Sequence, residues 1–561
     1  MPVPFRSRAS LAARAQALGS ASSSVALVVV LAAPVAAVLW SLRSPDREVW
    51  SLLARTTLAR MVLTTVGLAA GVAIGATVLG AGLAWLCATT RFPGSRAFRR
   101  LLVVPLALPS YVSAFVWTGL LQYSGPVQGM WRAWFGEKAW FPPVRTPVGA
   151  GLVLILSLYP YVYIASLSAL QEQASALCAA ASTLGLRSRA IFWRVALPAI
   201  RPALAAGAGL VAMETLTDVG VARAFSVSTL GDGVLRVWFG LDRRDAAAEL
   251  ASMLVGLVVL LVLVERLTRG RRRFTSRLTS PFPAEPVDLR GRKAAGAVTL
   301  CASTFLLAAG VPLGTLAVWA VDANRRGGEG ALDRTYVRLL QTSLELAAWT
   351  SVACVAVGTA LVLLARRDPW RRPAGWTVRA LSLASMGYAV PGLVVAAGVL
   401  TVLTWLDGRL DSIAQWNDRL YVPFLLAGST AGVVYALVVR FVAVARENID
   451  AGAHRVDPRV EQVAATLGVG GRRRRWRVTL PLLRPSILIA GLLVTIDALK
   501  ELPATLLLRP PGRDTLAVFV WNMTNESRWD EAATPALTIV ILGLPLVLFV
   551  LGRATAPVGR R

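Results

Sequence analysis

Long apolar runs alternate with short polar segments along the whole chain. About twelve stretches of roughly 20 apolar residues carry few or no charges, and each is long enough to cross a hydrocarbon core about 30 Å thick. The runs are continuous and do not alternate residue by residue, which favours helices over a barrel. The pattern predicts an all-α membrane protein with about 12 transmembrane helices in two tandem six-helix halves.

The expected spans fall into two sets of six. The first set covers residues 24–42, 61–88, 101–121, 147–170, 202–222 and 248–266. The second set covers residues 295–321, 340–365, 380–405, 423–445, 486–506 and 535–552.

Arginines gather in alternate loops between the apolar runs. Four lie in Arg91–Arg100, nine basic residues lie in Arg266–Lys293, and Arg472–Arg475 is an unbroken run. Positively charged loops stay on the cytoplasmic side, so these loops and both termini are expected inside the cell. The formal net charge of +28 is spread over such loops, so a nucleic-acid partner is not expected. The first run is longer than the apolar core of a signal peptide, and is therefore interpreted as a span.

Four cysteines and one histidine offer little chemistry. Cys87, Cys178, Cys301 and Cys354 are far apart in or beside apolar runs, and His454 has no neighbouring ligand set. Neither a disulfide framework nor a metal site follows, and no cofactor is expected.

A shift of 283 residues brings two cytoplasmic segments into register without a gap. Twelve of 22 positions in Ala181–Pro202 are identical to their counterparts in Ala464–Pro485. Each segment lies between the fourth and fifth spans of its half. The two halves therefore share one topology the same way up, which indicates a parallel duplication.

Each repeated segment predicts a helix-turn-helix elbow. A short Ala-rich helix, 175–184 or 458–467, stops at a glycine that can take a left-handed conformation. A second short helix is expected to end near Leu-Pro, and a further proline four residues later can begin the next span. The loop is the part that the halves have kept most alike, so it is expected to bind a partner protein.

The segment resembles the signature of ABC importer permeases, a Glu-Ala-Ala followed by three residues, Gly, and a spaced Leu-Pro. Gly185 to Pro198 and Gly468 to Pro481 are both thirteen residues apart, as in that family. The Glu-Ala-Ala is degenerate in both copies. The resemblance implies that the positions docking on an ATPase are Ala179, Ala180, Ala181, Gly185, Leu197 and Pro198, and Gln462, Val463, Ala464, Gly468, Leu480 and Pro481.

The same resemblance implies domains and partners. Residues 57–266 and 338–552 would each be a permease domain, with 1–56 holding the first span, 267–337 a basic linker and an extra span, and 553–561 a tail. The expected partners are an ABC ATPase dimer, a periplasmic or extracellular solute-binding protein, and the lipid bilayer of the inner membrane.

A second motif narrows the branch. The sequence from Asp497 to Pro510, with Asp514 following, resembles the fused two-domain ferric iron permeases. Glu214–Gly220 occupies the same register in the first half. The resemblance implies ferric iron as the substrate, with thiamine or a phosphonate as alternatives that share the fused architecture.

Several acidic residues lie near span ends. Glu214 and Asp218, and likewise Asp497 and Glu501, are spaced i to i+4, which would place each pair on one helix face. Such groups are costly in a membrane and usually face a cavity or a partner. They could form a gate for the substrate with Lys500 beside Asp497, or could hold helices together with Lys500 and Arg509 as their partners. The structural interpretation is favoured.

Two other functional classes are less consistent with the sequence. No Gly-rich phosphate loop ending in Gly-Lys-Ser or Gly-Lys-Thr occurs, so ATP hydrolysis would belong to a separate subunit and the chain would not be an enzyme. An ion-coupled secondary transporter should carry charges near mid-span and needs no strict loop signature. A membrane-embedded enzyme would need a nucleophile with a base, or a cluster of His and carboxylate residues.

Overall fold

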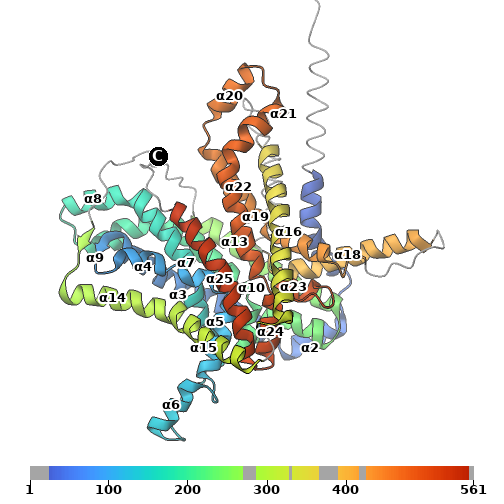
Figure 1. Cartoon of the computed structure of the whole chain (residues 1–561), viewed down its shortest axis with the longest axis horizontal. Helices are drawn as coiled ribbons and strands as arrows, with labels where there is room; N and C mark the ends of the chain where they lie inside the picture. The colour runs from blue at the N-terminus through green and yellow to red at the C-terminus, as the bar shows by residue number, and fades with distance from the viewer. Residues whose placement is uncertain (1–24, 270–285, 328–331, 366–389, 416–424, 555–561) are drawn as a thin grey trace, which may run out of the picture. The chain divides into compact units, whose positions relative to one another are not determined.

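The computed structural model describes residues 25–269, 286–327, 332–365, 390–415 and 425–554. Helices dominate these residues, and Figure 1 shows them as long rods joined by short turns. The all-α class that the apolar runs predict is confirmed.

The helices of the first half are Val25–Ser41, α2 (Arg47–Thr56), α3 (Leu58–Thr89), α4 (Ser95–Leu101), α5 (Ser110–Leu121), α6 (Pro126–Phe135), α7 (Pro147–Ala169), α8 (Ser175–Thr183), α9 (Ser188–Ile191), α10 (Leu197–Thr217), α11 (Val219–Ala224), α12 (Leu230–Leu235) and α13 (Arg244–Arg269). Those of the second half are α14 (Gly291–Phe305), α15 (Val311–Arg326), α16 (Arg334–Ala365), α18 (Gly392–Gln415), α19 (Thr430–Arg455), α20 (Pro458–Thr466), α21 (Gly471–Arg474), α22 (Leu480–Leu499), α23 (Pro503–Leu508), α24 (Leu516–Asn525) and α25 (Trp529–Ala554). Short 3-10 or π turns are η1 (Val104–Ala107), η2 (Leu170–Ala174), η3 (Phe192–Ala196), η4 (Arg236–Gly240), η5 (Leu306–Gly310) and η7 (Arg475–Thr479).

Within the described residues, 9 helices are long and apolar enough to cross a membrane, and one bent pair raises the number to 10. The bent pair is the span expected at 101–121. It is broken by 91° because η1 and then Pro109 interrupt the helix, where prolines cannot donate backbone hydrogen bonds. The expectation of one continuous helix there was wrong.

Other span boundaries also shift. The span expected at 202–222 ends at Thr217, and the one expected at 486–506 ends at Leu499. At the span expected at 423–445, the helix α19 starts at Thr430, carries Arg440 and Arg446, and is not among the helices apolar enough to count as a span. The expected number of about 12 spans is therefore not confirmed in the described residues. For the span expected at 380–405, α18 starts at Gly392, and residues 380–389 lie outside the described residues.

The chain divides into two compact units that do not coincide with its two halves. Unit 1 is Met1–Ser44 with Gln341–Asp514, and unit 2 is Pro45–Leu340 with Thr515–Arg561. The first helix of the chain thus belongs with the second half. The helices α14 and α15 and the last helices belong with the first half. The domain boundaries expected from the sequence stay a prediction.

In unit 1, the helix Val25–Ser41 packs closely on α18 and α19. The Tyr435 hydroxyl on α19 donates a hydrogen bond to the Val30 carbonyl oxygen at 2.6 Å. A Cβ atom at Gly398 would lie 2.0 Å from the Pro34 carbonyl oxygen, so only glycine allows this approach. Helix α22 packs along α19 in the same unit.

In unit 2, the helices α3, α7, α10 and α13 form one packed group, and α15 packs along α25. Aromatic rings on α5 contact rings on α15 and α25. Phe115 stacks on Trp319 with ring centroids 6.5 Å apart and on Trp529 at 6.2 Å. The described residues also contain one short parallel pairing, β1 (Thr90–Arg91) with β2 (Val287–Asp288), which fixes the end of the linker beside the loop after α3.

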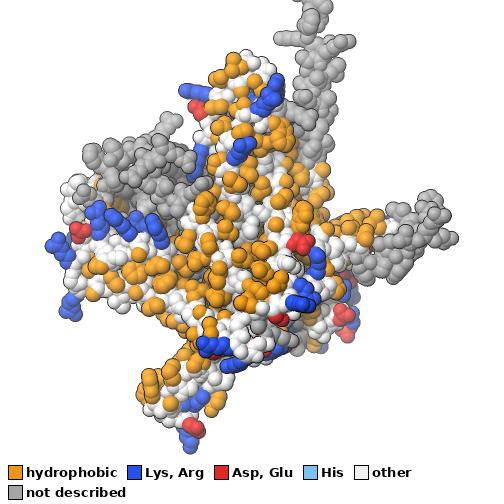
Figure 2. All heavy atoms as spheres, in the orientation of Figure 1, with side chains coloured by type: hydrophobic (Ala, Val, Ile, Leu, Met, Phe, Trp, Pro, Cys, Tyr) orange, Lys and Arg blue, Asp and Glu red, His pale blue; other side chains and the backbone are white. Residues whose placement is uncertain are grey.

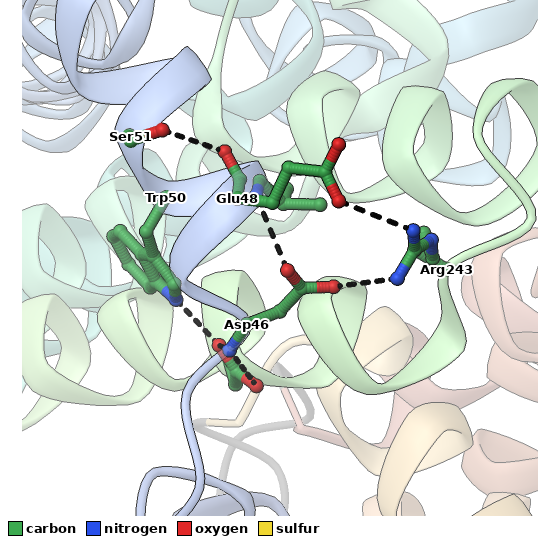
Figure 3. A network of polar contacts seen from close by, with 7 residues as sticks. Asp46, Glu48, Trp50, Ser51 and Arg243 are labelled. Carbon is green, nitrogen blue, oxygen red and sulfur yellow. Dashed lines mark hydrogen bonds and ion pairs between the residues drawn. The ribbon is translucent and has the colours of Figure 1, made fainter.

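In unit 2, a polar network joins the first residues of α2 to one end of α13 (Figure 3). The Asp46 side chain accepts a hydrogen bond from the Val49 backbone N–H, as a helix N-cap does, and lies 3.2 Å from Arg243. The Glu249 carboxylate accepts hydrogen bonds from the Asp46 backbone N–H and the Trp50 indole N–H. These contacts fix the amphipathic helix α2 on α13.

Candidate functional site

Both repeated segments fold as the same elbow, residue for residue. We call residues 175–196 the first elbow, in unit 2, and residues 458–479 the second elbow, in unit 1. Helix α8 corresponds to α20, α9 to α21, and η3 to η7, each with both boundaries shifted by 283 residues. Figure 1 shows α20 and α21 folded back at one end of α22. The duplication seen in the sequence is therefore a duplication in three dimensions.

A left-handed glycine turns the chain in both elbows. Gly185 has φ 79° and Gly468 has φ 78°. The N–H of the following residue bonds back across the helix end, Leu186 to the Ala181 carbonyl at 3.2 Å and Val469 to that of Ala464 at 3.0 Å. Such six-residue closures satisfy the last carbonyls of a helix and need a residue that tolerates positive φ. The glycine turn expected from the sequence is present in both copies.

The second arm of each elbow differs from the expectation. It does not end at Leu-Pro but continues through a π turn into the membrane helix, so that Ser188–Thr217 is one helix of 30 residues. Pro198 and Pro481 lie in the first turn of α10 and α22. In a π turn, each backbone hydrogen bond closes over five residues instead of four. Proline lacks only the backbone N–H donor there, so the helix continues past it along the same axis. The elbow is thereby rigidly joined to the span.

The positions of the degenerate Glu-Ala-Ala motif have the same burial in both copies. Ala179 and Gln462 are half-buried, Ala180 and Val463 are exposed, and Ala181 and Ala464 are buried against the elbow. Gly185 and Gly468 are exposed, while the Leu-Pro pairs Leu197-Pro198 and Leu480-Pro481 are half-buried. The glycine and Leu-Pro positions that the two copies share thus hold the shape of the elbow. The position at which the copies differ, Ala179 or Gln462, lies at the edge of the surface.

Large apolar side chains are exposed at equivalent places on the two elbows. Leu184 is 82% exposed and Leu467 is 77% exposed, and both lie directly before the turning glycine. Trp193 and Trp476 are exposed on the π turns. We call these four residues the elbow tips. Figure 2 shows apolar and basic side chains together over α20 and α21. The sequence analysis did not single out this apolar surface, although the identical Leu-Gly and Trp-Arg-Val positions were its signal.

The inner faces of the two elbows differ in polarity. In the second elbow, the Thr479 hydroxyl donates to Glu461 Oε1 at 3.0 Å. At the equivalent positions the first elbow has Cys178 and Ala196. Burial raises the pKa of the Cys178 thiol, which keeps it neutral. The second elbow is therefore held together by a hydrogen bond to a carboxylate at these positions, whereas the first elbow has apolar packing there.

Two of the acidic residues flagged by the sequence accept hydrogen bonds at equivalent positions, Asp218 as the N-cap of α11 and Glu501 directly before the N-cap of α23. Asp218 Oδ1 accepts from the Val221 N–H at 2.8 Å, and Glu501 Oε1 accepts from the Ala504 N–H at 3.1 Å. Both donor and acceptor are shifted by 283 residues. The Ser110 hydroxyl also donates to Asp218. Each carboxylate begins the short helix that follows its membrane span, α11 or α23.

The i to i+4 pairs do not share a helix face, contrary to the expectation. Helix α10 ends at Thr217, and Asp218 has an extended conformation with ψ 94°. Helix α22 ends at Leu499, before Glu501. Glu214 and Asp497 remain on the last turns of their helices, where both are half-buried. The chain turns between the two members of each pair.

The cationic partners were identified only in part. Lys500 lies 2.9 Å from Asp497, as expected. Arg509 pairs with Asp514 at 2.6 Å and with neither of the flagged acids, so that expectation was wrong. The partner of Glu501 is Arg440, whose guanidinium donates at 2.9 Å from helix α19. This pair is nearly inaccessible to solvent and was missed because its members are distant in the sequence.

The described residues contain no group of three or more His, Cys, Asp and Glu side chains placed to hold a metal ion. Of the flagged acids, Asp218 and Glu501 accept from backbone N–H groups, Glu501 also pairs with an arginine, and Asp497 pairs with a lysine. Their arrangement supports helix ends and turns.

Taken together, apolar helices long enough to cross a membrane and two equivalent elbows define a multi-pass membrane protein with an internal duplication. The chain belongs to the family of binding-protein-dependent transport system inner membrane components, which matches twice, at residues 76–278 and 370–556. Each match includes one elbow. The chain is therefore an ABC importer permease of the inner membrane, and the secondary-transporter alternative is set aside.

Two curated relatives match almost the whole chain, and a third matches part of it. An Fe(3+)-transport system permease protein, FbpB 2 of Haemophilus influenzae, is 25% identical over 501 residues, which cover 89% of this chain and 90% of that protein. The ferric transport system permease protein FbpB of Actinobacillus pleuropneumoniae is 22% identical over 522 residues, 90% of this chain and 72% of that protein. A putative 2-aminoethylphosphonate transport system permease protein, PhnV of Salmonella typhimurium, is 32% identical over 160 residues, 28% of this chain and 54% of that protein.

Proposed function

We propose that this chain is the membrane pathway of a ferric iron importer, driven by a separate ATPase that grips the two elbows. The observation that carries the proposal is the repetition of the elbow at a constant shift of 283 residues, down to the turning glycine and the π turn. The two relatives named as ferric permeases match the chain over nearly its full length.

The elbows are suited to transmit force. Each joins its membrane helix without a break, since Ser188–Thr217 is one helix and Arg475–Leu499 is another. A displacement of an elbow therefore moves a whole span. The exposed leucines and tryptophans of the elbow tips offer apolar surface of the kind that protein partners bury. The fixed glycine turn presents Leu184 and Leu467 in the same way on each copy.

The proposed orientation places both elbows and both termini in the cytoplasm. The arginine-rich loops support it, because the run at Arg472–Arg475 lies in the second elbow and the first elbow carries Arg187, Arg189 and Arg194. A solute-binding protein would deliver the substrate on the opposite face. The chain itself would hydrolyse no ATP.

The direct test is uptake of radioactive ferric iron into proteoliposomes that contain the chain and its ATPase, with the solute-binding protein outside. Uptake should need ATP inside and should stop when the ATPase is omitted. An ion gradient that drives equal uptake without the ATPase would contradict the proposal.

A phosphonate is the second candidate substrate, because PhnV shares 32% identity with part of the chain. The ligand that the solute-binding protein of this permease retains decides between the two substrates. Retention of ferric iron by that protein supports the proposal. Retention of 2-aminoethylphosphonate in its place would keep the permease mechanism and change the substrate.

A further inference from the structure

A small polar cavity lies in unit 2 at the end of α7 and α10 that is remote from the first elbow. It has a volume of about 120 Å³. Its walls include Tyr111, Arg145, Arg223, Trp521, Asn525 and Trp529. Arg145 immediately precedes the N-cap of α7, and Arg223 is on α11, just after α10 ends. Helix α7 spans 23 residues, about 35 Å, so the cavity and the elbow are a membrane thickness apart.

Two arginines are the only charged residues among those that line the cavity. Arg223 is held in place from behind, because its Nε lies 2.6 Å from Asp232 Oδ1. Arg236 also pairs with Asp232, whose side chain is almost fully buried. Two arginines thus pair with one carboxylate, and Arg145 adds a further positive charge to the cavity wall, which leaves the site with a net positive charge. Among the described residues, no ion pair is found for Arg145.

The shape of the cavity is fixed by a close backbone approach. A Cβ atom at Gly220 would lie 2.3 Å from the Tyr111 Cβ, so α11 and α5 meet at that glycine. Aromatic rings of Trp521 and Trp529 form other walls, and the Asn525 side chain supplies an amide. A rigid, partly apolar wall around arginine side chains lowers the local dielectric constant and strengthens their attraction for an anion.

We propose that this cavity binds a small oxyanion of the phosphate or carboxylate class. Guanidinium groups match the oxygens of such anions with paired N–H donors. The volume equals that of about four water molecules in the liquid, which suits an ion with four or five heavy atoms. A bare ferric cation would be repelled there. The site goes beyond the proposed function, because it does not depend on ATP, the ATPase or the elbows.

The test is equilibrium binding of radioactive inorganic phosphate to the purified full-length chain in detergent, with chloride added to equal ionic strength. The expected result is saturable binding to one site. Arg145→Gln should weaken it at least tenfold, and Asn525→Leu should weaken it as well. The matched control is Arg47→Gln on α2, which removes an exposed arginine outside the cavity and should leave binding unchanged.

The oxyanion can arrive free or as a ligand of iron, and competition distinguishes the two sources. Equal displacement of phosphate by acetate and by ferric acetate at the same acetate concentration indicates a free anion, whereas stronger displacement by ferric acetate indicates an anion that carries its metal. Absence of saturable phosphate binding would overturn the proposal. Equal binding to wild type and Arg145→Gln would also overturn it. Neither failure would affect iron uptake driven by the ATPase.

Discussion

Arg440 on α19 donates a hydrogen bond to Glu501 at 2.9 Å, with only 8% and 4% of the two side chains exposed. Glu501 at the same time accepts a hydrogen bond from the Ala504 N–H in the first turn of α23. A single carboxylate thus joins two helices of unit 1 and starts a third. This position was a candidate gate residue from the sequence, and its contacts favour a structural role.

Glu501→Gln tests that role. The variant removes the negative charge of the buried Arg440–Glu501 pair, and breaking one side of a buried pair costs about 3–5 kcal/mol. We expect a clear fall in the thermal unfolding midpoint of the purified chain. Asp514→Asn is the control, since it breaks the more exposed pair with Arg509 and should cost at most about 1 kcal/mol. Equal stability of Glu501→Gln and wild type would contradict the structural interpretation.

Glu214→Gln and Asp497→Asn test whether a carboxylate gate exists. Both side chains are half-buried on the last turns of α10 and α22. If they only support the helix ends, each single variant should retain iron uptake and ATPase stimulation within about twofold. A loss of uptake of about a hundredfold or more, without loss of stability, would instead establish the gate.

Gly185→Val and Gly468→Val test the turning glycines. A β-branched residue at φ near 79° is strained by about 1–3 kcal/mol, although open space surrounds both Cβ positions. The elbow should change shape, so ATP hydrolysis should persist while iron uptake falls. Gln462→Ala is the control, because its equivalent Ala179 already serves the first elbow. Normal uptake in both glycine variants would show that the turn has no part in coupling.

Gly398→Ala tests the packing of the first helix on the second half. The added Cβ would lie 2.0 Å from the Pro34 carbonyl oxygen, and backbone cannot move as cheaply as a side-chain end. We expect a loss of about 1–3 kcal/mol, as for other overpacked positions, measured by thermal unfolding. Gly408→Ala on the same helix meets nothing within 4 Å and should be neutral or slightly stabilising. Equal effects of the two would contradict the close approach.

The apolar pattern was sufficient to predict the fold class, because membrane helices must satisfy their own backbone and their length is set by the bilayer. The elbow was predictable because its two copies align without a gap, and the glycine turn has a local cause. The features that the sequence did not predict are mostly tertiary contacts. The exchange of leading helices between the units and the Arg440–Glu501 pair join residues that no local pattern relates.

The errors near span ends have a different origin. The i to i+4 spacing of Glu214 and Asp218 indicates a common face only if the helix continues, and it stops at Thr217. Likewise Pro198 was expected to end a helix, but it follows a π turn and the helix continues from Ser188 to Thr217. Both errors reflect uncertainty in helix boundaries and leave the identity of the elements unchanged.

The central claim is that the elbow tips dock on an ATPase. It is tested most directly by the affinity of the purified partner ATPase for the chain in nanodiscs. Burial of two leucines is worth about 1.5–3 kcal/mol each, so the double variant Leu184→Arg, Leu467→Arg should weaken binding at least a hundredfold. Leu332→Arg changes an equally exposed leucine outside both elbows and should bind as wild type does. Wild-type affinity in the double variant would contradict the account.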